Sequence, residues 1–335
     1  MALRVAINGF GRIGRLVYRA ILENKDKDID VVCINDLGPI ASNAHLLKYD
    51  TVHGVLPMDV EVNDENLIIK DQTTRVVAEK DPTDLPWKEM DVDIALECTG
   101  LFASKEAASS HLVAGAKRVL ISAPAKDADI TVVYGVNSDK LRSEHHIVSN
   151  ASCTTNCLAP IAHVMHQSFG IERGFMTTIH SFTGDQRTVD TLHSDLHRAR
   201  AASASMIPTS TGAARAVGLV LPELVGKLDG TSIRVPTPNV SVIDFKFVPQ
   251  QEVTVESVNS AMSEAASEEL NGILSTNKEP LVSTDFNHNP HSSIFDLSET
   301  QVVDKKLVRI LSWYDNEWGF SNRMIDTSKL IGQML

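Results

Sequence analysis

The fold of this 335-residue chain is decided by residues 4–14, which read RVAINGFGRIG. An apolar run leads into a glycine motif formed by Gly9, Gly11 and Gly14, and a stretch with helical spacing follows at residues 12–24. In such a strand-turn-helix unit, the glycines let the turn close and let the backbone approach a pyrophosphate at the helix N-terminus. The motif therefore predicts a dinucleotide site.

A carboxylate follows this motif at the spacing that ribose recognition requires. The apolar run at residues 31–34 ends in Asn35 and Asp36, about twenty residues after the motif. A carboxylate at that point accepts a hydrogen bond from the 2'-hydroxyl of the adenosine ribose and repels a 2'-phosphate. Asp36 therefore predicts NAD rather than NADP as the cofactor.

The hydrophobic pattern divides the chain into two parts. The first 150 residues alternate short apolar runs with helical stretches, which is typical of βαβ units and a parallel sheet. Beyond Phe175 the runs are longer and partly alternating, so we expect a mainly antiparallel sheet there. The predicted fold class is α/β, with a Rossmann-type doubly wound parallel sheet domain and an α+β catalytic domain.

Individual elements are predicted from the same pattern. In the first part we expect strands at residues 4–7, 29–34, 93–97, 118–122 and 130–135, and helices at 12–24 and 105–114. In the second part we expect strands at residues 175–182, 231–235, 240–248 and 307–314, and helices at 253–270 and 321–335. Residues 185–210 are polar and show little periodicity, and a loop this long is usually functional.

Composition excludes several classes of partner. The chain has 31 Lys+Arg against 43 Asp+Glu, a net charge of −12, so nucleic acid and anionic membranes are not expected as principal partners. Apolar runs fall short of the roughly 18 residues of a spanning helix, and basic residues interrupt the N-terminal apolar stretch. Four cysteines are too few for a disulfide scaffold. We therefore expect a cytoplasmic protein with reduced thiols, in which any special cysteine is catalytic.

The strongest candidate nucleophile is Cys153, in the run SNASCTTNCLAP at residues 149–160. Capping residues precede an apolar helical stretch, which puts Cys153 in a first turn whose amides and dipole lower a thiol pKa of about 8.5. Cys157 lies one turn further and is interpreted as a packed hydrophobe. A metal site with His163 and His166 does not fit, because these histidines follow on the same helix, so no metal is expected.

A thiolate nucleophile usually needs a base, and His180 is the best placed candidate. It follows the run at residues 174–179, where a strand would deliver its side chain to the edge of a site, although a histidine at a strand end is more often structural than catalytic. His53, His111 and His145 lack a flanking motif and are interpreted as surface or core residues.

Four segments together carry a family resemblance: residues 8–15 (NGFGRIGR), 149–156 (SNASCTTN), 180–183 (HSFT) and 314–319 (YDNEWG). The chain resembles the phosphorylating glyceraldehyde-3-phosphate dehydrogenases over essentially its whole length. The resemblance implies an NAD-binding domain at residues 1–152, completed by a helix at 317–335, and a catalytic domain at 153–316. It also implies a homotetramer, with residues 185–210 as an S-shaped loop that reaches a neighbouring subunit's cofactor site.

The resemblance further implies a reaction. Cys153 would attack the aldehyde of D-glyceraldehyde 3-phosphate, and His180 would lower the thiol pKa and then take the hydroxyl proton as hydride leaves for NAD. Inorganic phosphate would cleave the resulting thioester to 1,3-bisphosphoglycerate, a step of glycolysis and gluconeogenesis.

The family's binding positions are also filled. Besides the three glycines, cofactor contacts are implied for Arg12, Ile13, Asp36, Thr99, Phe102 and Ser122, and Asn316 would hold the nicotinamide carboxamide. The substrate phosphate would contact Arg234 and Thr183, and the attacking phosphate would contact Ser152, Thr154, Thr211, Gly212 and Arg198. The guanidinium fork matches phosphate oxygens. The departures from the family pattern are Lys80, where an arginine near the adenine is common, Gly184, and Thr191 with Leu192.

Three alternatives are weighed against this hypothesis. Erythrose-4-phosphate dehydrogenases share the cysteine and histidine and resemble residues 283–292, but they usually lack the Thr183 position and the intact PTSTG run at 208–212. Both features are present here, which favours the triose. A Cys-His hydrolase would need no dinucleotide fold, and a nucleic-acid or cytoskeletal binding protein would need a basic, aromatic patch that the sequence lacks.

Overall fold

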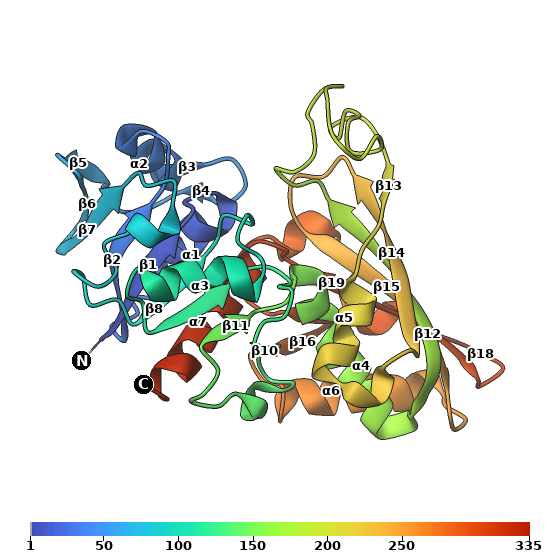
Figure 1. Cartoon of the computed structure of the whole chain (residues 1–335). Helices are drawn as coiled ribbons and strands as arrows, with labels where there is room; N and C mark the ends of the chain where they lie inside the picture. Colours follow the sequence, from blue (N-terminus) through green and yellow to red (C-terminus); the bar gives the residue numbers. More distant parts are fainter. Residues whose placement is uncertain (1) are drawn as a thin grey trace. The chain divides into compact units, whose positions relative to one another are not determined.

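A computed structural model describes residues 2–335 (Figure 1). Its contacts divide the chain into two compact units. The first unit runs to Val132 and adds Ser138–Ala151 and Ser321–Leu335. The second unit comprises Val133–Asn137 and Ser152–Phe320.

The first unit is built on a nine-stranded sheet in the order β10-β11-β9-β8-β1-β2-β7-β6-β5 (Figure 1). Its parallel strands are β1 (Leu3–Asn8), β2 (Ile29–Asn35), β7 (Gln72–Val77), β8 (Ile94–Glu97), β9 (Arg118–Ile121), β10 (Ile130–Thr131) and β11 (Ile147–Ser149). The antiparallel additions are β5 (Glu61–Asn63) and β6 (Asn66–Ile69). The predicted parallel sheet is confirmed, whereas the short, largely exposed strand β5 carries no hydrophobic signal that would predict it.

Helices and a small hairpin complete this unit. They are α1 (Arg12–Glu23), α2 (Ile40–Lys48), α3 (Lys105–Val113), and the pair β3 (Tyr49–Asp50) and β4 (Gly54–Val55). Helix α1 forms where predicted because Leu16, Val17 and Ala20 fall on one face and are buried. The predicted strand at residues 130–135 is shorter, because the chain joins the second unit at Val133.

The strand order places a crevice at the glycine motif. The chain leaves β1 for β2 on one side and later returns to β8 on the other side. In open α/β sheets, ligands bind outside the carboxyl ends of the strands at such a reversal. The order therefore marks the carboxyl ends of β1, β2 and β8 as the binding edge.

The second unit is built on an eight-stranded, mainly antiparallel sheet in the order β13-β14-β12-β15-β19-β17-β16, with β18 beside β19. Its strands are β12 (Ile171–Ser181), β13 (Ile207–Thr209), β14 (Leu228–Val235), β15 (Ser241–Pro249), β16 (Leu274–Asn277), β17 (Ser293–Asp296), β18 (Gln301–Val303) and β19 (Leu307–Tyr314). Its helices are α4 (Cys153–Phe169), α5 (Ala213–Val220) and α6 (Val255–Ser267), and α7 (Trp318–Gly332) follows β19. Most strand pairs of this sheet are antiparallel, which confirms the prediction of a mainly antiparallel sheet.

Two strand pairs of this sheet, β12 with β14 and β16 with β17, are parallel. A parallel pair needs a crossover connection. The connection from β12 to β14 contains the polar segment 182–206, β13 and α5. This segment is therefore anchored at one end by β12 and at the other by β13, which pairs with β14.

Helix α4 packs on β12, β15, β17 and β19 and contacts α5 and α6. Phe245 and Phe247 are buried and stack on each other, with ring centroids 5.3 Å apart. The short 3₁₀ helices of the described chain are η1 (Pro82–Asp84), η2 (Ser138–Lys140), η3 (Pro222–Leu224), η4 (Ser283–Phe286) and η5 (Leu297–Glu299).

Candidate active site

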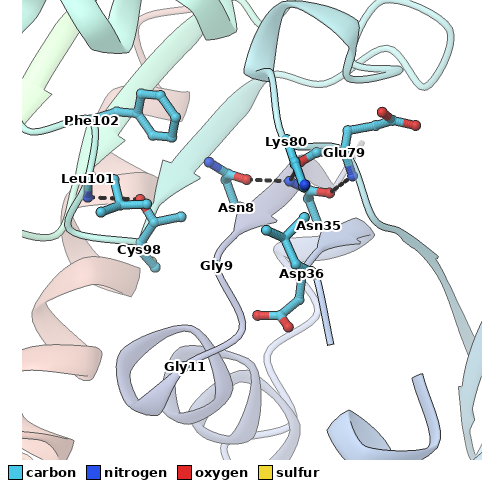
Figure 2. A pocket seen from close by; sticks show the side chains of 12 residues that line it. Asn8, Gly9, Gly11, Asn35, Asp36, Glu79, Lys80, Cys98, Leu101 and Phe102 are labelled. Carbon is cyan, nitrogen blue, oxygen red and sulfur yellow. Dashed lines mark hydrogen bonds between the residues drawn. The ribbon is translucent and has the colours of Figure 1, made fainter. Parts of the chain in front are cut away.

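A cavity of about 340 Å³ lies in the first unit at the carboxyl ends of β1, β2 and β8 (Figure 2). It is lined by Asn8, Gly9, Gly11, Asn35, Asp36, Leu37, Glu79, Lys80, Cys98, Thr99, Leu101 and Phe102. The chain order predicts a ligand site at this edge, and the cavity lies there.

The three glycines have distinct roles. Gly9 has a φ of +91°, and a Cβ on it would lie 2.7 Å from the backbone nitrogen of Thr99. A Cβ on Gly14 would lie 2.1 Å from the carbonyl oxygen of Gly9. A Cβ on Gly11 would meet no atom within 4 Å, although Gly11 lines the cavity. Gly9 and Gly14 therefore close the turn, and Gly11 leaves space for a ligand to approach the backbone.

Asp36 is fixed at this cavity by backbone donors. Its Oδ2 accepts a hydrogen bond from the amide of Phe10 at 2.9 Å, and its Oδ1 accepts one from the amide of Gly38 at 2.9 Å. An ionised carboxylate has about four acceptor positions, so capacity for a ribose hydroxyl remains. The cavity and its carboxylate fit the adenosine half of a dinucleotide.

The other predicted cofactor residues divide into two groups. Thr99 and Phe102 line the cavity, as does the departure Lys80. Arg12 instead forms an ion pair with Asp50, and the amide of Ser122 donates to the carbonyl of Glu97 at 3.0 Å. Arg12, Ile13, Gly14 and Ser122 are not among the residues that line the cavity, and the cofactor contacts of both groups stay predictions.

A buried polar network under this cavity was missed by sequence reasoning. Glu97 is 1% exposed. Its carboxylate accepts hydrogen bonds from the side-chain amide of Asn8 at 2.6 Å and from the backbone amide of Thr99 at 2.8 Å. Nε2 of His111 lies 2.9 Å from Glu97, and Asn8 also accepts from Asn35 at 2.7 Å. Figure 2 shows the contact between Asn8 and Asn35. His111 is thus a core residue that supports the floor of the cavity.

In the second unit, Cys153 is the first residue of α4, as predicted. The hydroxyl of Ser152 accepts a hydrogen bond from the amide of Thr155 at 3.0 Å and caps the helix. The thiol of Cys153 lies 3.6 Å from Nε2 of His180, near the end of β12. Cys157 is fully buried, with its sulfur 3.4 Å from the hydroxyl of Ser293, which confirms its interpretation as a packed residue.

Burial affects the pKa values of both members of this pair. Burial raises the pKa of the Cys153 thiol, and the charge of Arg234 only partly opposes this shift. Burial and the charge of Arg234 together lower the pKa of His180 to about 3. The direction of the shift at Cys153 is thus opposite to the one expected from the helix N-terminus and His180, because burial disfavours the thiolate.

Arg234 lies beside this pair because β14 pairs with β12 in a register that places it opposite His180. Its Nη1 lies 2.9 Å from Nδ1 of His180 and 3.2 Å from the carbonyl oxygen of Ser181. Its buried Nε finds no hydrogen-bond partner among residues 2–335. A buried guanidinium with an unused donor suits an anion.

The other predicted anion contacts lie at helix starts and in the segment 182–206. Thr211 and Gly212 precede α5, and the Thr211 hydroxyl accepts from the amide of Ala213 at 3.2 Å. The hydroxyl of Thr154 is 2.9 Å from that of Tyr314. The amide of Thr183 donates to Gln186 at 3.4 Å.

Arg198 is held by two carboxylates. It forms ion pairs with Asp185 and, at 3.4 Å, with Asp195, and its side chain is 17% exposed. Its predicted anion must therefore compete with these carboxylates.

Asn316 follows β19 and has a defined amide orientation. Its Oδ1 accepts from Ser181 at 2.9 Å and from Ser241 at 2.8 Å. Both lone pairs of Oδ1 are used, so the NH₂ group of Asn316 is the part that faces other acceptors. A ligand's carboxamide oxygen is an acceptor of this kind. Ser181 and Ser241 were missed because their role depends on sheet packing rather than on a local motif.

Comparisons with known proteins match most of the chain. Residues 3–105 match the NAD binding domain of glyceraldehyde 3-phosphate dehydrogenase, and residues 152–316 match the C-terminal domain of glyceraldehyde 3-phosphate dehydrogenase. The chain belongs to the glyceraldehyde-3-phosphate dehydrogenase family. The resemblance inferred from four short segments is thus confirmed.

Full-length relatives agree with this membership of the family. The chain is 63% identical to glyceraldehyde-3-phosphate dehydrogenase of Xanthobacter flavus over 334 residues, covering 100% of both chains. It is 59% identical to that of Cereibacter sphaeroides, with 100% of both chains covered, and 57% identical to that of Geobacillus stearothermophilus, with 99% and 98% covered. Nothing in these comparisons favours the erythrose-4-phosphate alternative.

The NAD-binding match includes the glycine motif, Asp36 and Phe102, and the C-terminal match includes Cys153 and His180. Across residues 2–335, no helix combines the length and the apolar character that crossing a membrane demands.

Proposed function

We propose that this chain catalyses the NAD-dependent oxidative phosphorylation of D-glyceraldehyde 3-phosphate to 1,3-bisphosphoglycerate. The observation that carries the proposal is the thiol of Cys153 at 3.6 Å from Nε2 of His180, with Arg234 bonded to the same imidazole. A nucleophile, a base and a phosphate ligand thus meet at one point, which an aldehyde with a phosphate two carbons away requires.

The chemistry follows from these residues. Sγ of Cys153 forms a bond to the aldehyde carbon, and the thiol proton passes through His180 to the carbonyl oxygen, which gives a thiohemiacetal. His180 then takes the hydroxyl proton as the carbon loses hydride, which leaves a thioester on Cys153. Bound NAD⁺ supplies the hydride acceptor. A phosphate oxygen attacks the thioester, the C–S bond breaks, and the acyl phosphate leaves.

Two sets of residues receive the two anions in this proposal. Arg234 and Thr183 bind the phosphate of the aldehyde, whereas Arg198 binds the attacking phosphate with residues 152, 154, 211 and 212. The starts of α4 and α5 support the second assignment, because helix N-termini present unpaired amides to anions. Asn316 holds the nicotinamide carboxamide through its NH₂ group.

The activity is tested by following nicotinamide reduction in purified protein. Glyceraldehyde 3-phosphate and erythrose 4-phosphate are each supplied with and without inorganic phosphate, and with NAD or NADP. We expect rapid NAD reduction with the triose that depends on phosphate. Preference for the tetrose, or turnover that needs no phosphate, would contradict the proposal.

Asp36→Ala is expected to reduce the preference for NAD over NADP by about 10- to 100-fold. The variant loses a charged acceptor for the 2'-hydroxyl and also loses the repulsion of a 2'-phosphate. The ratio of dissociation constants for the two cofactors measures this effect, and the unfolding temperature controls for the lost bonds to Phe10 and Gly38. An unchanged ratio would mean that Asp36 does not contact the ribose.

Arg234→Leu and Arg198→Leu are expected to impair different steps. Each variant loses a charged hydrogen-bond partner worth roughly 1.5 to 3 kcal/mol. This loss corresponds to about one to two decades in a rate or affinity ratio. The Arg234 variant should lose activity with the phosphorylated aldehyde far more than with unphosphorylated glyceraldehyde. The Arg198 variant should chiefly need more inorganic phosphate and show a burst of NADH before a slow, phosphate-dependent steady state.

Stopped-flow absorbance of NADH distinguishes the two defects. Equal losses for both aldehydes in Arg234→Leu, or a wild-type phosphate dependence in Arg198→Leu, would contradict these assignments. Arg215, an exposed arginine of the same unit that lies 3.8 Å from Asp229, provides a matched control as Arg215→Leu.

The assembly and compartment are part of the same proposal. Exposed apolar side chains gather in the segment 182–206, including Val189 at 69%, Leu192 at 91% and Leu196 at 81%. Such a group suits a second copy of the chain, in line with the homotetramer that the resemblance implies. Four free cysteines suit the reducing cytoplasm. Sedimentation velocity tests the tetramer, and a monomer at micromolar concentration would contradict it.

A further inference from the structure

Glu97, the last residue of β8, is a buried carboxylate that accepts hydrogen bonds from four donors of the described chain. Its Oε1 accepts from the backbone amide and the hydroxyl of Thr99. Its Oε2 accepts from the side-chain amide of Asn8 at 2.6 Å and from Nε2 of His111 at 2.9 Å. An ionised carboxylate has about four acceptor positions, so these partners use its full capacity.

The donors on His111 and Thr99 are fixed by contacts that do not involve Glu97. Nε1 of Trp87 donates to Nδ1 of His111 at 3.1 Å, and an indole can only donate. Nδ1 of the neutral imidazole therefore has no proton, and Nε2 carries the proton that it donates to Glu97. The hydroxyl of Thr99 accepts from the amide of Leu101 at 3.0 Å, and its own proton is directed to Glu97.

The donor on Asn8 is fixed by a further chain of hydrogen bonds (Figure 2). The backbone amide of Glu79 donates to Oδ1 of Asn35 at 2.8 Å, so Nδ2 of Asn35 is the atom that donates to Oδ1 of Asn8 at 2.7 Å. Asn8 therefore turns its own Nδ2 to Glu97. All four partners of Glu97 are thus committed as donors, and only an ionised carboxylate accepts from all of them.

The same hydrogen bonds join the strand ends that form the cavity. Four residues of this network follow or end neighbouring strands and line the cavity: Thr99 after β8, Asn8 on β1, Asn35 on β2 and Glu79 after β7. The turns after β1 and β8 are close, because a Cβ on Gly9 would lie 2.7 Å from the backbone nitrogen of Thr99. Asp36, the predicted ribose ligand, directly follows Asn35. A displacement of this network therefore reaches the walls of the cavity.

We propose that Glu97 is a positioning residue of the cofactor site, whose ionised carboxylate holds these strand ends in the geometry that binds NAD. Glu97 and His111 do not line the cavity, so they act through the residues that do. Loss of a buried acceptor leaves its donors unpaired in the interior, where they are costly. This inference rests on the proposed function, since it places NAD in this cavity.

Glu97→Gln is the first test, because it exchanges one acceptor atom for a donor at nearly constant volume. The new carboxamide can turn its oxygen either to Thr99 or to Asn8 and His111, so the other donors then face an NH₂ group. We expect the dissociation constant of NAD, measured by titration calorimetry on folded full-length protein, to rise by about 10-fold or more. A lowered unfolding temperature with an unchanged dissociation constant would overturn the inference, because the network would then be structural only.

Asp129→Asn is the matched control. Asp129 belongs to the same unit, accepts from the amides of His146 and Ile147 at 2.8 Å each, and forms an ion pair with Lys105 at 2.6 Å. It does not line the cavity. This variant should lower the unfolding temperature and leave the dissociation constant of NAD unchanged. A rise that matches that of Glu97→Gln would overturn the inference, since loss of stability alone would explain both.

Asn8→Asp in the Glu97→Gln background tests the direction of the hydrogen bonds. The carboxylate at position 8 can accept from the carboxamide at position 97 and from Asn35, while the carboxamide oxygen still accepts from Thr99. Asn8 is 1% exposed, so the moved charge stays buried. Asn8→Asp alone puts two carboxylates within hydrogen-bond distance. We expect the double variant to bind NAD about 10-fold more tightly than either single variant. Affinity no better than that of Glu97→Gln would overturn the inference.

His111→Phe keeps the test decisive if Glu97→Gln does not fold. The variant keeps a ring at this position but removes one donor to Glu97, and it cannot contact a ligand in the cavity directly. We expect the dissociation constant of NAD to rise by about threefold or more. An unchanged value in the folded variant would overturn the inference.

Failure of the proposed function gives a different result. If Asp36→Ala weakens NAD binding and Glu97→Gln does not, the cavity still holds the cofactor and only the inference is overturned. If neither variant changes the dissociation constant, NAD does not occupy this cavity, and the inference falls with that assignment. Neither result depends on catalytic activity.

Discussion

Cys153→Ser is expected to lower the rate of aldehyde oxidation by at least about 10⁴-fold, as removal of a covalent nucleophile does in other enzymes. A serine hydroxyl has a pKa far above that of a thiol, and His180 lies beside it as a neutral imidazole that supplies no charge to stabilise an alkoxide. Cofactor binding should persist, because the cavity at Asp36 and Thr99 lies in the first unit. Nicotinamide reduction and the dissociation constant of NAD measure the two effects.

Cys157→Ser is the matched control. Its sulfur lies among buried groups and contacts the hydroxyl of Ser293, so a hydroxyl at this position can still find a partner. We expect a modest loss of stability and activity close to wild type. Comparable losses of activity in the two variants, each still folded by circular dichroism, would remove the assignment of Cys153 as the nucleophile.

His180→Asn is expected to lower kcat/KM by about 10²- to 10⁴-fold at neutral pH, which is the usual contribution of a general base. Burial raises the pKa of the Cys153 thiol, so without a base only the small thiolate fraction can react. That fraction grows as the pH rises toward the thiol pKa. The loss should therefore be largest at low pH and shrink at high pH, and pH profiles of kcat/KM for both proteins measure it.

The acid side of the wild-type profile provides a further check. The free-enzyme pKa of His180 is lowered to about 3, so the imidazole stays unprotonated through the range around 6.5 where an ordinary histidine titrates. The wild type should therefore show no loss of kcat/KM from protonation of His180 near pH 6.5. A loss in His180→Asn that does not depend on pH would indicate a positioning role rather than a base.

Features determined by the sequence alone are those whose physics acts between near neighbours in the chain. The turn at Gly9 and Gly14 needs only the steric freedom of glycine, and Asp36 follows it at the end of the next strand. Cys153 begins a helix because Ser152 caps it from the adjacent position. These signals predicted the parallel sheet and the NAD cofactor correctly, and they placed Cys153 at the start of a helix, where it stays the predicted nucleophile.

The tertiary structure decided how these parts act on one another. His180 meets Arg234 across 54 residues of sequence through the register of β12 and β14, and Glu97 meets Asn8 across 89 residues. No local sequence pattern predicts that the pKa of Cys153 is raised or that the pKa of His180 is lowered. Strand register and desolvation depend on which distant parts of the chain pack together. Periodicity and capping motifs reflect only residues close in sequence, so they do not predict these effects.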